Sequence, residues 1–240
     1  MPVLDRPLRI GDQVAVLDDN AKAANALRWL VDEAGFDPIL IKPNPRGVEE
    51  MVKEIVEKAA AAISDHRLGH AGPISYSGAE VVARANVVRI PAILITSYAN
   101  SDENTTIRQW RSGIPQMLNR GSEGNSPDLI TQALAIADDE RRGIYLPQRK
   151  AYRTVVRVED TRDGPDGLIA EVVVTAWRPQ QTVSIPVSLI GDLVKGIPPR
   201  RLKRRRFMAE VNIYAETAGE LFFREFEPAP DIPEDWLPTV

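Results

Sequence analysis

Short apolar runs alternate with amphipathic helical patterns through the first 143 residues, and this alternation constrains the fold more than any other feature. The first run is QVAVLDDN at 13–20, and the first helical pattern is AKAANALRWLVDEAGF at 21–36. Further strands are expected at 37–42, 60–65, 89–99 and 114–118, and further helices at 47–59, 78–87, 103–113 and 126–141. Continuously apolar strands separated by helices indicate a parallel sheet covered on both faces. We therefore expect a doubly wound α/β domain.

The pattern changes after residue 147. Five runs of β-type composition follow, separated by turn signals such as DGPDG, and one short helical piece interrupts them at 188–196. The runs expected to form strands are 151–160, 167–178, 181–190, 206–216 and 220–227. We therefore divide the chain into an α/β domain at 1–147 and a smaller β-rich or α+β domain at 148–240, whose Pro- and acid-rich end is expected to be extended.

Composition excludes several classes of site. The 240 residues include no cysteine, which excludes disulfides, thiolate metal sites and cysteine nucleophiles, and the net charge is −4 with acids and bases mixed. A chain of this charge is not drawn as a whole to nucleic acid or to an anionic membrane. No stretch approaches the roughly eighteen apolar residues of a membrane span, and the N-terminus lacks the apolar region of a signal peptide. We predict a cytoplasmic protein without membrane association.

Acidic residues stand at the ends of two expected strands. Asp18 and Asp19 end the first strand, Asp65 ends the third, and Thr96 and Ser97 end the fourth. In a parallel sheet, functional groups collect at the carboxyl ends of the strands, beside the point where the strand order reverses. If the order is 2-1-3-4-5, the first and third strands are neighbours, and the three carboxylates are expected to converge. Taken singly, each acid is better explained as a helix cap or a solvent-facing strand end; only the three together favour a metal site.

Converging carboxylates need a cation or bound protons, because their charges repel one another. Oxygen ligands without histidine or cysteine favour Mg²⁺, which also accepts a phosphate oxygen. Asp65 is then a candidate nucleophile, because a carboxylate can attack a phosphoryl group while the metal neutralises the developing charge. The hydroxyl of Thr96 is placed to hydrogen-bond a phosphate oxygen, and a cation from the fifth strand would complete the clamp.

The sequence resembles the CheY-like receiver domains of bacterial response regulators over about residues 10–143. VAVLDDN looks like the acidic pair of that family, AAAISDHRL like the strand that ends in the phosphorylated aspartate, and IPAILITSYA like the strand that ends in the switch threonine or serine. WRSGIPQMLNRG is similar to the segment that leads into the family's Lys-Pro. The resemblance implies a flavodoxin-like sheet of order 2-1-3-4-5, and it does not extend to 148–240.

Carried over by position, the resemblance makes Asp65 the phosphoacceptor. It assigns Mg²⁺ to Asp18, Asp19 and Asp65 with the backbone carbonyl of Arg67, and it places Thr96 against the phosphoryl group. It implies a histidine kinase or phosphotransfer protein as the partner in a phosphorelay. The face of the fourth helix and fifth strand is the homodimer surface that the resemblance implies.

The sequence departs from the family at three positions. Arg120 aligns with the family's lysine, or Asn119 does if the register slips by one residue; Gly121 replaces the proline, and Met117 occupies the usual aromatic switch position. An arginine keeps the positive charge but is a wider, planar donor, so phosphate pairing is retained with altered geometry. Arg120 as a phosphate ligand and Arg120 as a surface residue stand as equal alternatives.

These features predict a response-regulator-like phosphoprotein that is not an enzyme. Asp65 would be phosphorylated by a histidine kinase with Mg²⁺, and 148–240 would provide the output through protein interaction or dimerisation. A non-switching pseudo-receiver that acts as an interaction scaffold is the alternative suggested by Arg120 and its neighbours. A Mg²⁺-dependent phosphohydrolase is less favoured, because that family has an acid two residues after its nucleophile, whereas Asp18 and Asp19 are adjacent.

Two further features have charge or ligand chemistry. His66 and His70 are the only histidines and follow Asp65 closely; a metal or phosphate-relay role is conceivable for them, but a solvated loop is favoured. The segment Arg200–Arg206 has six cations in seven positions and thus the charge to contact nucleic-acid phosphates. No nucleic-acid-binding signature accompanies it, so we favour a solvated loop or an acidic protein partner over nucleic acid.

Overall fold

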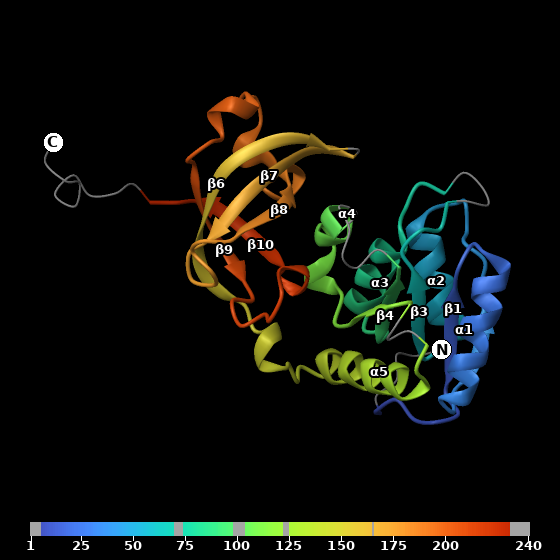
Figure 1. Ribbon diagram of the computed structural model, residues 1–240. Helices are drawn as coiled ribbons and strands as arrows, with labels where there is room; N and C mark the ends of the chain where they lie inside the picture. Colours follow the sequence, from blue (N-terminus) through green and yellow to red (C-terminus); the bar gives the residue numbers. More distant parts are fainter. Residues whose placement is uncertain (1–5, 70–73, 98–103, 122–124, 165, 231–240) are drawn as a thin grey trace, which may run out of the picture. The chain divides into compact units, whose positions relative to one another are not determined.

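Five parallel strands in the order β2-β1-β3-β4-β5 form the sheet of the N-terminal part of the chain (Figure 1). This order and the parallel pairing confirm the predicted flavodoxin-like, doubly wound sheet. The strands are β1 Gln13–Leu17, β2 Asp37–Leu40, β3 Ala61–Asp65, β4 Ala92–Thr96 and β5 Met117–Asn119. The helices are α1 Ala21–Glu33, α2 Val48–Lys58, α3 Gly78–Val87, α4 Asn104–Arg108 and α5 Pro127–Arg141.

The structure, a computed structural model, describes residues 6–69, 74–97, 104–121, 125–164 and 166–230. It divides into two compact units, 1–146 and 147–240, so the division falls one residue before the expected boundary. The end of the chain that was expected to be extended lies largely outside the described residues. No helix in the described part is both long and apolar enough to cross a bilayer.

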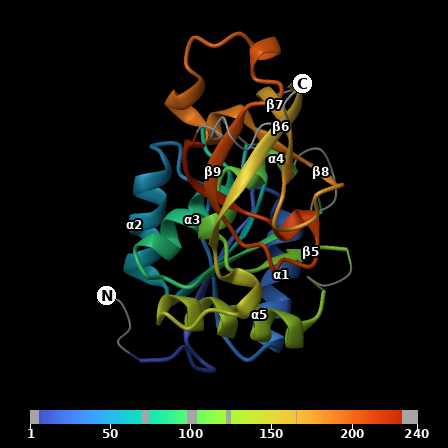
Figure 2. The ribbon, with the colours of Figure 1, turned by 90° about the vertical axis from the view of Figure 1, so that its left-hand side faces the viewer.

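Alternation of side chains along the strands gives the sheet an apolar core on each face. Val14, Val16 and Ile63 point to the face covered by α1 and α5, whereas Ala15 and Leu17 point to the face covered by α2 and α3. All five side chains are at most 1% exposed. Figure 2 shows α2 and α3 running side by side on their face. A sheet covered on both faces explains why its strands are apolar throughout.

The fourth helix is shorter than the periodicity of 103–113 predicts. α4 ends at Arg108, and a separate 3₁₀ turn covers Arg111–Gly113. Asn86 of α3 donates a hydrogen bond to the carbonyl oxygen of Gly113 at 3.1 Å, and a Cβ on Gly113 would lie 2.9 Å from the Cβ of Ala83. This close packing of Gly113 against α3 overrides the local helical pattern, because tertiary contacts outweigh propensity.

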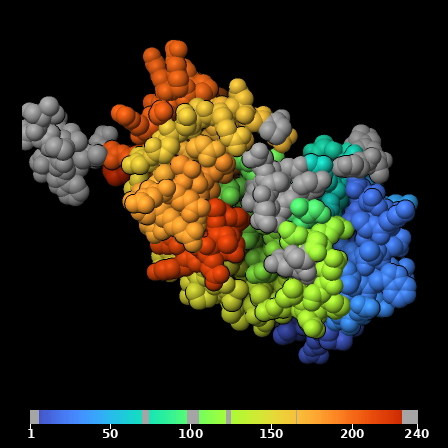
Figure 3. All heavy atoms as spheres, viewed as in Figure 1, coloured from blue at the N-terminus to red at the C-terminus, as the bar shows by residue number. Residues whose placement is uncertain are grey.

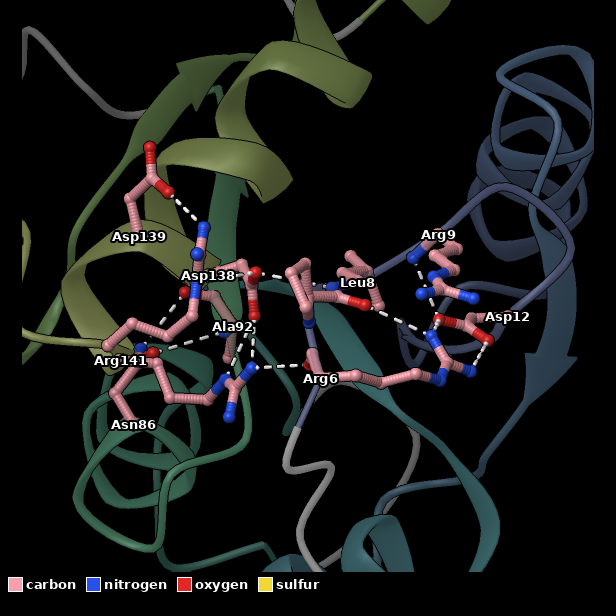
Figure 4. A network of polar contacts seen from close by, with 11 residues as sticks. Arg6, Leu8, Arg9, Asp12, Asn86, Ala92, Asp138, Asp139 and Arg141 are labelled. Atoms are coloured by element: carbon pink, nitrogen blue, oxygen red, sulfur yellow. Dashed lines mark hydrogen bonds and ion pairs between the residues drawn. The ribbon is translucent and has the colours of Figure 1, made fainter.

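A buried carboxylate fixes the segment before β1 to α5. Asp138 is 3% exposed, and its Oδ2 accepts a hydrogen bond from the backbone N–H of Leu8 at 3.2 Å. Its Oδ1 accepts one from Nη2 of Arg141 at 2.6 Å, and the same Nη2 donates to the carbonyl oxygen of Arg6 at 2.9 Å (Figure 4). Because a buried charge must be paired and hydrogen-bonded, this network holds the N-terminal segment in one place.

The second unit contains a five-stranded antiparallel sheet in the order β10-β9-β6-β7-β8, which confirms the β-rich prediction. Its strands are β6 Tyr152–Gly164, β7 Gly167–Val174, β8 Thr182–Pro186, β9 Arg206–Val211 and β10 Phe223–Pro228. In place of one helical piece at 188–196, the chain forms 3₁₀ turns at Val187–Leu189 and Gly191–Val194. Buried valines of β6 and β7 and a buried phenylalanine from each of β9 and β10 form a separate core.

Candidate functional site

The candidate site lies at the carboxyl ends of β1 and β3. Leu17 is in register with Ser64 across these parallel strands, so the residues that follow them, Asp18 and Asp65, come next at the same edge. The Asp18 side chain is 3% exposed and the Asp65 side chain 15%. The strand order that places β1 beside β3 therefore brings two largely buried carboxylates to one edge of the sheet.

The guanidinium of Arg120 joins these two carboxylates. Its Nη2 donates to Oδ2 of Asp18 at 2.7 Å and to Oδ1 of Asp65 at 3.0 Å, and its side chain is 23% exposed. One nitrogen atom thus bridges two acids that are far from it in sequence. The expected cation from the end of the fifth strand is present, and it contacts both acids directly.

Backbone pairing between β4 and β5 positions Arg120. Thr96 is in register with Asn119, and the backbone N–H of Arg120 donates to the carbonyl oxygen of Thr96 at 3.0 Å. The Thr96 residue itself is fully buried. Because β4 lies between β3 and β5, this bond aims the arginine back across β4 toward Asp65.

Local hydrogen bonds fix the two carboxylates further. Oδ1 of Asp18 accepts from the backbone N–H of Asn20 at 2.9 Å, and Asn20 in turn caps the N-terminus of α1. Oδ2 of Asp65 accepts from the backbone N–H of Arg67 at 3.0 Å. The contact that the structure shows from Arg67 is therefore made by its N–H, and metal ligation by its carbonyl stays a prediction.

Burial raises the pKa of Asp65 above its ordinary value. The positive charge of Arg120 lowers this pKa and the negative charge of Asp18 raises it, while the hydrogen bonds from Arg67 and Arg120 lower it. The desolvation cost is the largest of these effects, so the net shift is upward. Burial therefore makes the ionised form of Asp65 costlier to hold than that of a solvated aspartate, and Arg120 offsets part of this cost.

Gly78 is a residue of the site that sequence reasoning missed. Its N–H donates to the carbonyl oxygen of His66 at 2.8 Å, and a Cβ built on it would lie 1.6 Å from the carbonyl oxygen of Asp65. Only glycine lets the first turn of α3 approach the backbone of Asp65 so closely. The sequence signal is weak, because a glycine after the N-cap Ser77 is unremarkable in itself.

The histidine prediction was wrong for His66. Its side chain is 6% exposed rather than solvated, and its Nε2 lies 3.2 Å from Oγ1 of Thr106, at hydrogen-bonding distance. His66 thus belongs to the packed region behind Asp65. His70 lies outside the described residues.

A cavity of about 520 Å³ adjoins the acidic edge. Asp18 and the partly exposed Asp19 contribute to its wall, together with Lys42 from the chain that follows β2. Most of the remaining wall is apolar and includes Leu40, Ile41, Leu68 and Ile74. The acidic edge therefore forms part of the wall of a pocket large enough for a small ligand.

The carboxylate oxygens at this edge are the kind of ligand that a hard divalent cation takes, but they already bond to Arg120. In the described part of the chain, no group of three or more histidine, aspartate or glutamate side chains is arranged to hold a metal ion. Asp18 and Asp65 offer the carboxylate oxygens that Mg²⁺ takes, and Arg120 supplies positive charge between them. A metal held by both acids would compete with this guanidinium for them.

Comparison with known proteins finds likeness only at the level of structure. No family model matches the chain, and no curated protein matches it. A response regulator receiver domain from Clostridium thermocellum is 14% identical, with a TM-score of 0.41, over 55% of this chain and 98% of its own length. The receiver domain of a modulated diguanylate cyclase from Desulfovibrio desulfuricans is 20% identical, with a TM-score of 0.44, over 55% and 97%.

A third solved structure, the anti-anti-sigma factor PhyR from Bartonella quintana, is 19% identical, with a TM-score of 0.40, over 56% of this chain and 50% of its own length. Receiver domains match the N-terminal part of this chain. The C-terminal β-rich unit stays unassigned.

Proposed function

We propose that the N-terminal unit is a receiver-type signalling module that accepts a phosphoryl group on Asp65. The observation that carries the proposal is the arrangement of three side chains: Asp65 at the end of β3, Asp18 beside it, and Arg120 bonded to both. A carboxylate beside a guanidinium can act as a nucleophile toward a phosphoryl group whose oxygens the guanidinium then pairs. The chain would regulate other proteins rather than turn over a separate substrate.

The transfer would exchange one bond to phosphorus for another. An oxygen of Asp65 forms a bond to phosphorus, and the bond from phosphorus to the donor nitrogen of a phosphohistidine, or to the oxygen of acetyl phosphate, breaks. The leaving group takes the electron pair of that bond. Arg120 would leave the carboxylate and pair with the new phosphoryl oxygens, because their charge exceeds that of the carboxylate that it replaces.

Mg²⁺ is the cofactor that we propose for this site. Asp18 and Asp65 would hold it, with Asp19 and the carbonyl of Arg67 as the further ligands that the sequence suggests. Bound there, the ion would neutralise the charge of the phosphoryl group during transfer. The ion would compete with Arg120 for the oxygens of Asp18 and Asp65.

The Arg120 bridge offers a physical basis for switching. In the structure the bridge ties the end of β5 to the ends of β1 and β3 through two ion pairs. Modification of Asp65 would change the partners of Arg120 and thereby the position of the chain after β5. The face formed by α4 and β5 would report this change to a partner or to a second copy, and the C-terminal unit would provide the output.

The same bridge supports a second candidate, a scaffold that does not switch. If Arg120 never leaves the two acids, the unit keeps its fold and its surfaces but accepts no phosphate. A histidine kinase or phosphotransfer protein would then be a binding partner at most.

Under the favoured proposal such a kinase donates the phosphoryl group, and we expect the reaction to take place in the cytoplasm.

Intact-mass spectrometry of the full chain with acetyl phosphate tests the proposal. We expect an adduct of one phosphoryl group that requires Mg²⁺, is absent in Asp65→Asn, and persists in Asp139→Asn, which changes a partly exposed acid on α5. Absence of the adduct from the wild-type chain at all Mg²⁺ concentrations would overturn the proposal and favour the scaffold. An adduct that persists in Asp65→Asn would show that another residue is the acceptor.

A further inference from the structure

The second unit carries a strongly basic surface that the proposed receiver function does not use. Arg200, Arg201, Lys203 and Arg204–Arg206, here called the basic segment, are all exposed. Throughout the described ranges of the chain, none of these six cations forms an ion pair with a carboxylate. Most other arginines of this unit do, as Arg162 does with Glu171. The basic segment is therefore a concentration of uncompensated charge on a chain whose net charge is negative.

The backbone of the basic segment is held in place. Leu202 is 1% exposed and packs into the core of the unit. The N–H of Arg204 donates to the carbonyl oxygen of Val158 at 2.7 Å, and the N–H of Val158 donates to that of Arg205 at 2.9 Å. Figure 3 shows the orange part of the chain around residue 200 standing out from the surface of the unit. Fixed attachment points lower the entropy lost when these side chains bind a ligand.

Three of the arginines surround a hollow. Arg204, Arg205 and Arg206 line a depression of about 410 Å³, closed on its other sides by Leu193, Phe207 and Pro228–Pro230. Among the residues that the structure describes, none with an acidic side chain lines it. A concave, positively charged site with apolar walls focuses the electrostatic potential more than a convex surface does.

Strand pairing places no carboxylate directly opposite Arg206. Arg206 on β9 is directly opposite Arg157 on β6, and both are exposed. Arg157 pairs with Glu159, its own neighbour along β6, at 2.5 Å between Nε and Oε1. Like charges opposite one another on neighbouring strands destabilise a sheet. An anion bound at Arg206 would relieve this repulsion.

We propose that the basic segment binds adjacent phosphate groups, as in a nucleotide polyphosphate or a nucleic-acid backbone, with the hollow as its centre. Guanidinium groups pair with phosphate through two parallel hydrogen bonds, and five of the six cations are arginines. Linked phosphates place several negative charges in a small volume, which matches three arginines around one hollow. Carboxylates of an acidic protein carry one charge per side chain and match this density less well.

Fluorescence anisotropy with the full chain and a labelled 20-nucleotide single-stranded DNA tests this inference, with tripolyphosphate and polyglutamate as competitors. The test variant is Arg204→Gln/Arg205→Gln/Arg206→Gln. The matched control is Arg162→Gln/Arg178→Gln/Arg224→Gln, which removes the same charge elsewhere in this unit. Thermal unfolding of each variant checks that the fold persists, and we expect it to, because all six arginines are exposed.

We expect the test variant to bind at least ten times more weakly than the control. The slope of log affinity against log salt concentration should be shallower for the test variant than for the control by about two. Each phosphate contact on a single strand contributes ~0.7 to this slope, and the test variant lacks three arginines. Competition by tripolyphosphate, at concentrations whose ionic strength alone does not release the DNA, would identify a small phosphorylated ligand. DNA binding that tripolyphosphate does not compete for would identify a nucleic-acid backbone. Equal weakening in the control, or equal competition by polyglutamate, would overturn the inference.

Discussion

The first turn of α3 is packed directly against the backbone of the proposed phosphoacceptor: a Cβ on Gly78 would lie 1.6 Å from the carbonyl oxygen of Asp65 and 2.5 Å from Oγ of Ser64. No side-chain movement relieves a contact with a backbone carbonyl in a central strand. The position of Asp65 is therefore fixed both by α3, which packs against its backbone, and by Arg120, which bonds its carboxylate.

Gly78→Ala should destabilise the N-terminal unit and displace Asp65. Overpacking a close contact typically costs about 1–3 kcal/mol, and a contact with backbone belongs at the upper end, so we expect the melting temperature to fall by about 6 °C or more. Gly69→Ala is the matched control in the same connection, because among the described residues the nearest atom to its Cβ would be the carbonyl oxygen of Ile74, at 3.8 Å. Equal melting temperatures for the two variants in thermal unfolding would show that the α3 contact is looser than the structure indicates.

Asp65→Asn should stabilise the unmodified chain at neutral pH. Burial raises the pKa of Asp65, so the folded state holds a proton that the unfolded state has already lost as the pH rises above the usual value near 3.8. Stability is therefore lost as pH rises through the window between the usual pKa and the raised one, and the asparagine removes this loss. Arg120 keeps Asp18 as a partner in the variant.

The measurement is the melting temperature of wild type and Asp65→Asn between pH 4 and pH 8. We expect the variant to gain a few degrees at pH 7 and to converge with wild type at the acidic end. Asp139→Asn, which removes a partly exposed acid paired with Arg142 at the surface, is the control and should give parallel curves. A variant that is less stable than wild type at pH 7 would mean that the Arg120 ion pair outweighs desolvation.

The sheet and the acidic edge were predictable because they depend on local patterns. Continuous apolar runs identify strands such as β3, and parallel pairing places Asp18 and Asp65 together whatever the details of the loops. The sequence predicted a cation from the end of the fifth strand and gave Arg120 as a candidate, but not that one nitrogen of Arg120 would bond two acids that lie 102 and 55 residues away. The break after Arg108 was missed for the same reason, since it follows from packing of Gly113 against α3.

The antiparallel order of the second sheet depends even more on distant pairing. β6 lies between β7, its sequence neighbour, and β9, which follows almost fifty residues later. Alternating runs and turn signals identify the strands but do not say which non-neighbours pair. Arg206 and Phe207 of β9 line the hollow of the basic segment, and both pair with β6. The sequence therefore showed the charge of the basic segment but not the shape of the hollow.

Tyr76→Phe should destabilise the connection between β3 and α3. The buried hydroxyl of Tyr76 accepts from the N–H of Asn44 at 2.8 Å and donates to the carbonyl oxygen of Asn44 at 2.9 Å. The phenylalanine leaves both backbone groups without this partner, at a cost of about 1–3 kcal/mol in the free energy of unfolding. Tyr214→Phe, at a 60% exposed position, is the control for denaturant unfolding and should change little. A stability equal to that of the control would mean that water replaces the hydroxyl.

Arg120→Gln should destabilise the chain and increase its response to Mg²⁺. Asp18 and Asp65 lose the cation that they share, which should cost about 1–3 kcal/mol at neutral pH because both carboxylates are largely buried. The pKa of Asp65 should rise further, since the charge and hydrogen bond of Arg120 both lower it. The deficit should therefore shrink as the pH falls and Asp65 takes up a proton.

Mg²⁺ should stabilise Arg120→Gln more than it stabilises wild type, because in the wild-type chain the ion competes with a guanidinium held by two ion pairs. A ligand that binds only the folded state raises the melting temperature according to its affinity, so thermal unfolding across a Mg²⁺ series measures the difference. Arg120→Lys should fall between the two, because an ammonium keeps the charge in a different shape. Arg28→Gln, an exposed change on α1, should respond as wild type does. If Mg²⁺ raises the melting temperature of all four proteins equally, the ion binds elsewhere, and Arg120 does not compete with it for Asp18 and Asp65.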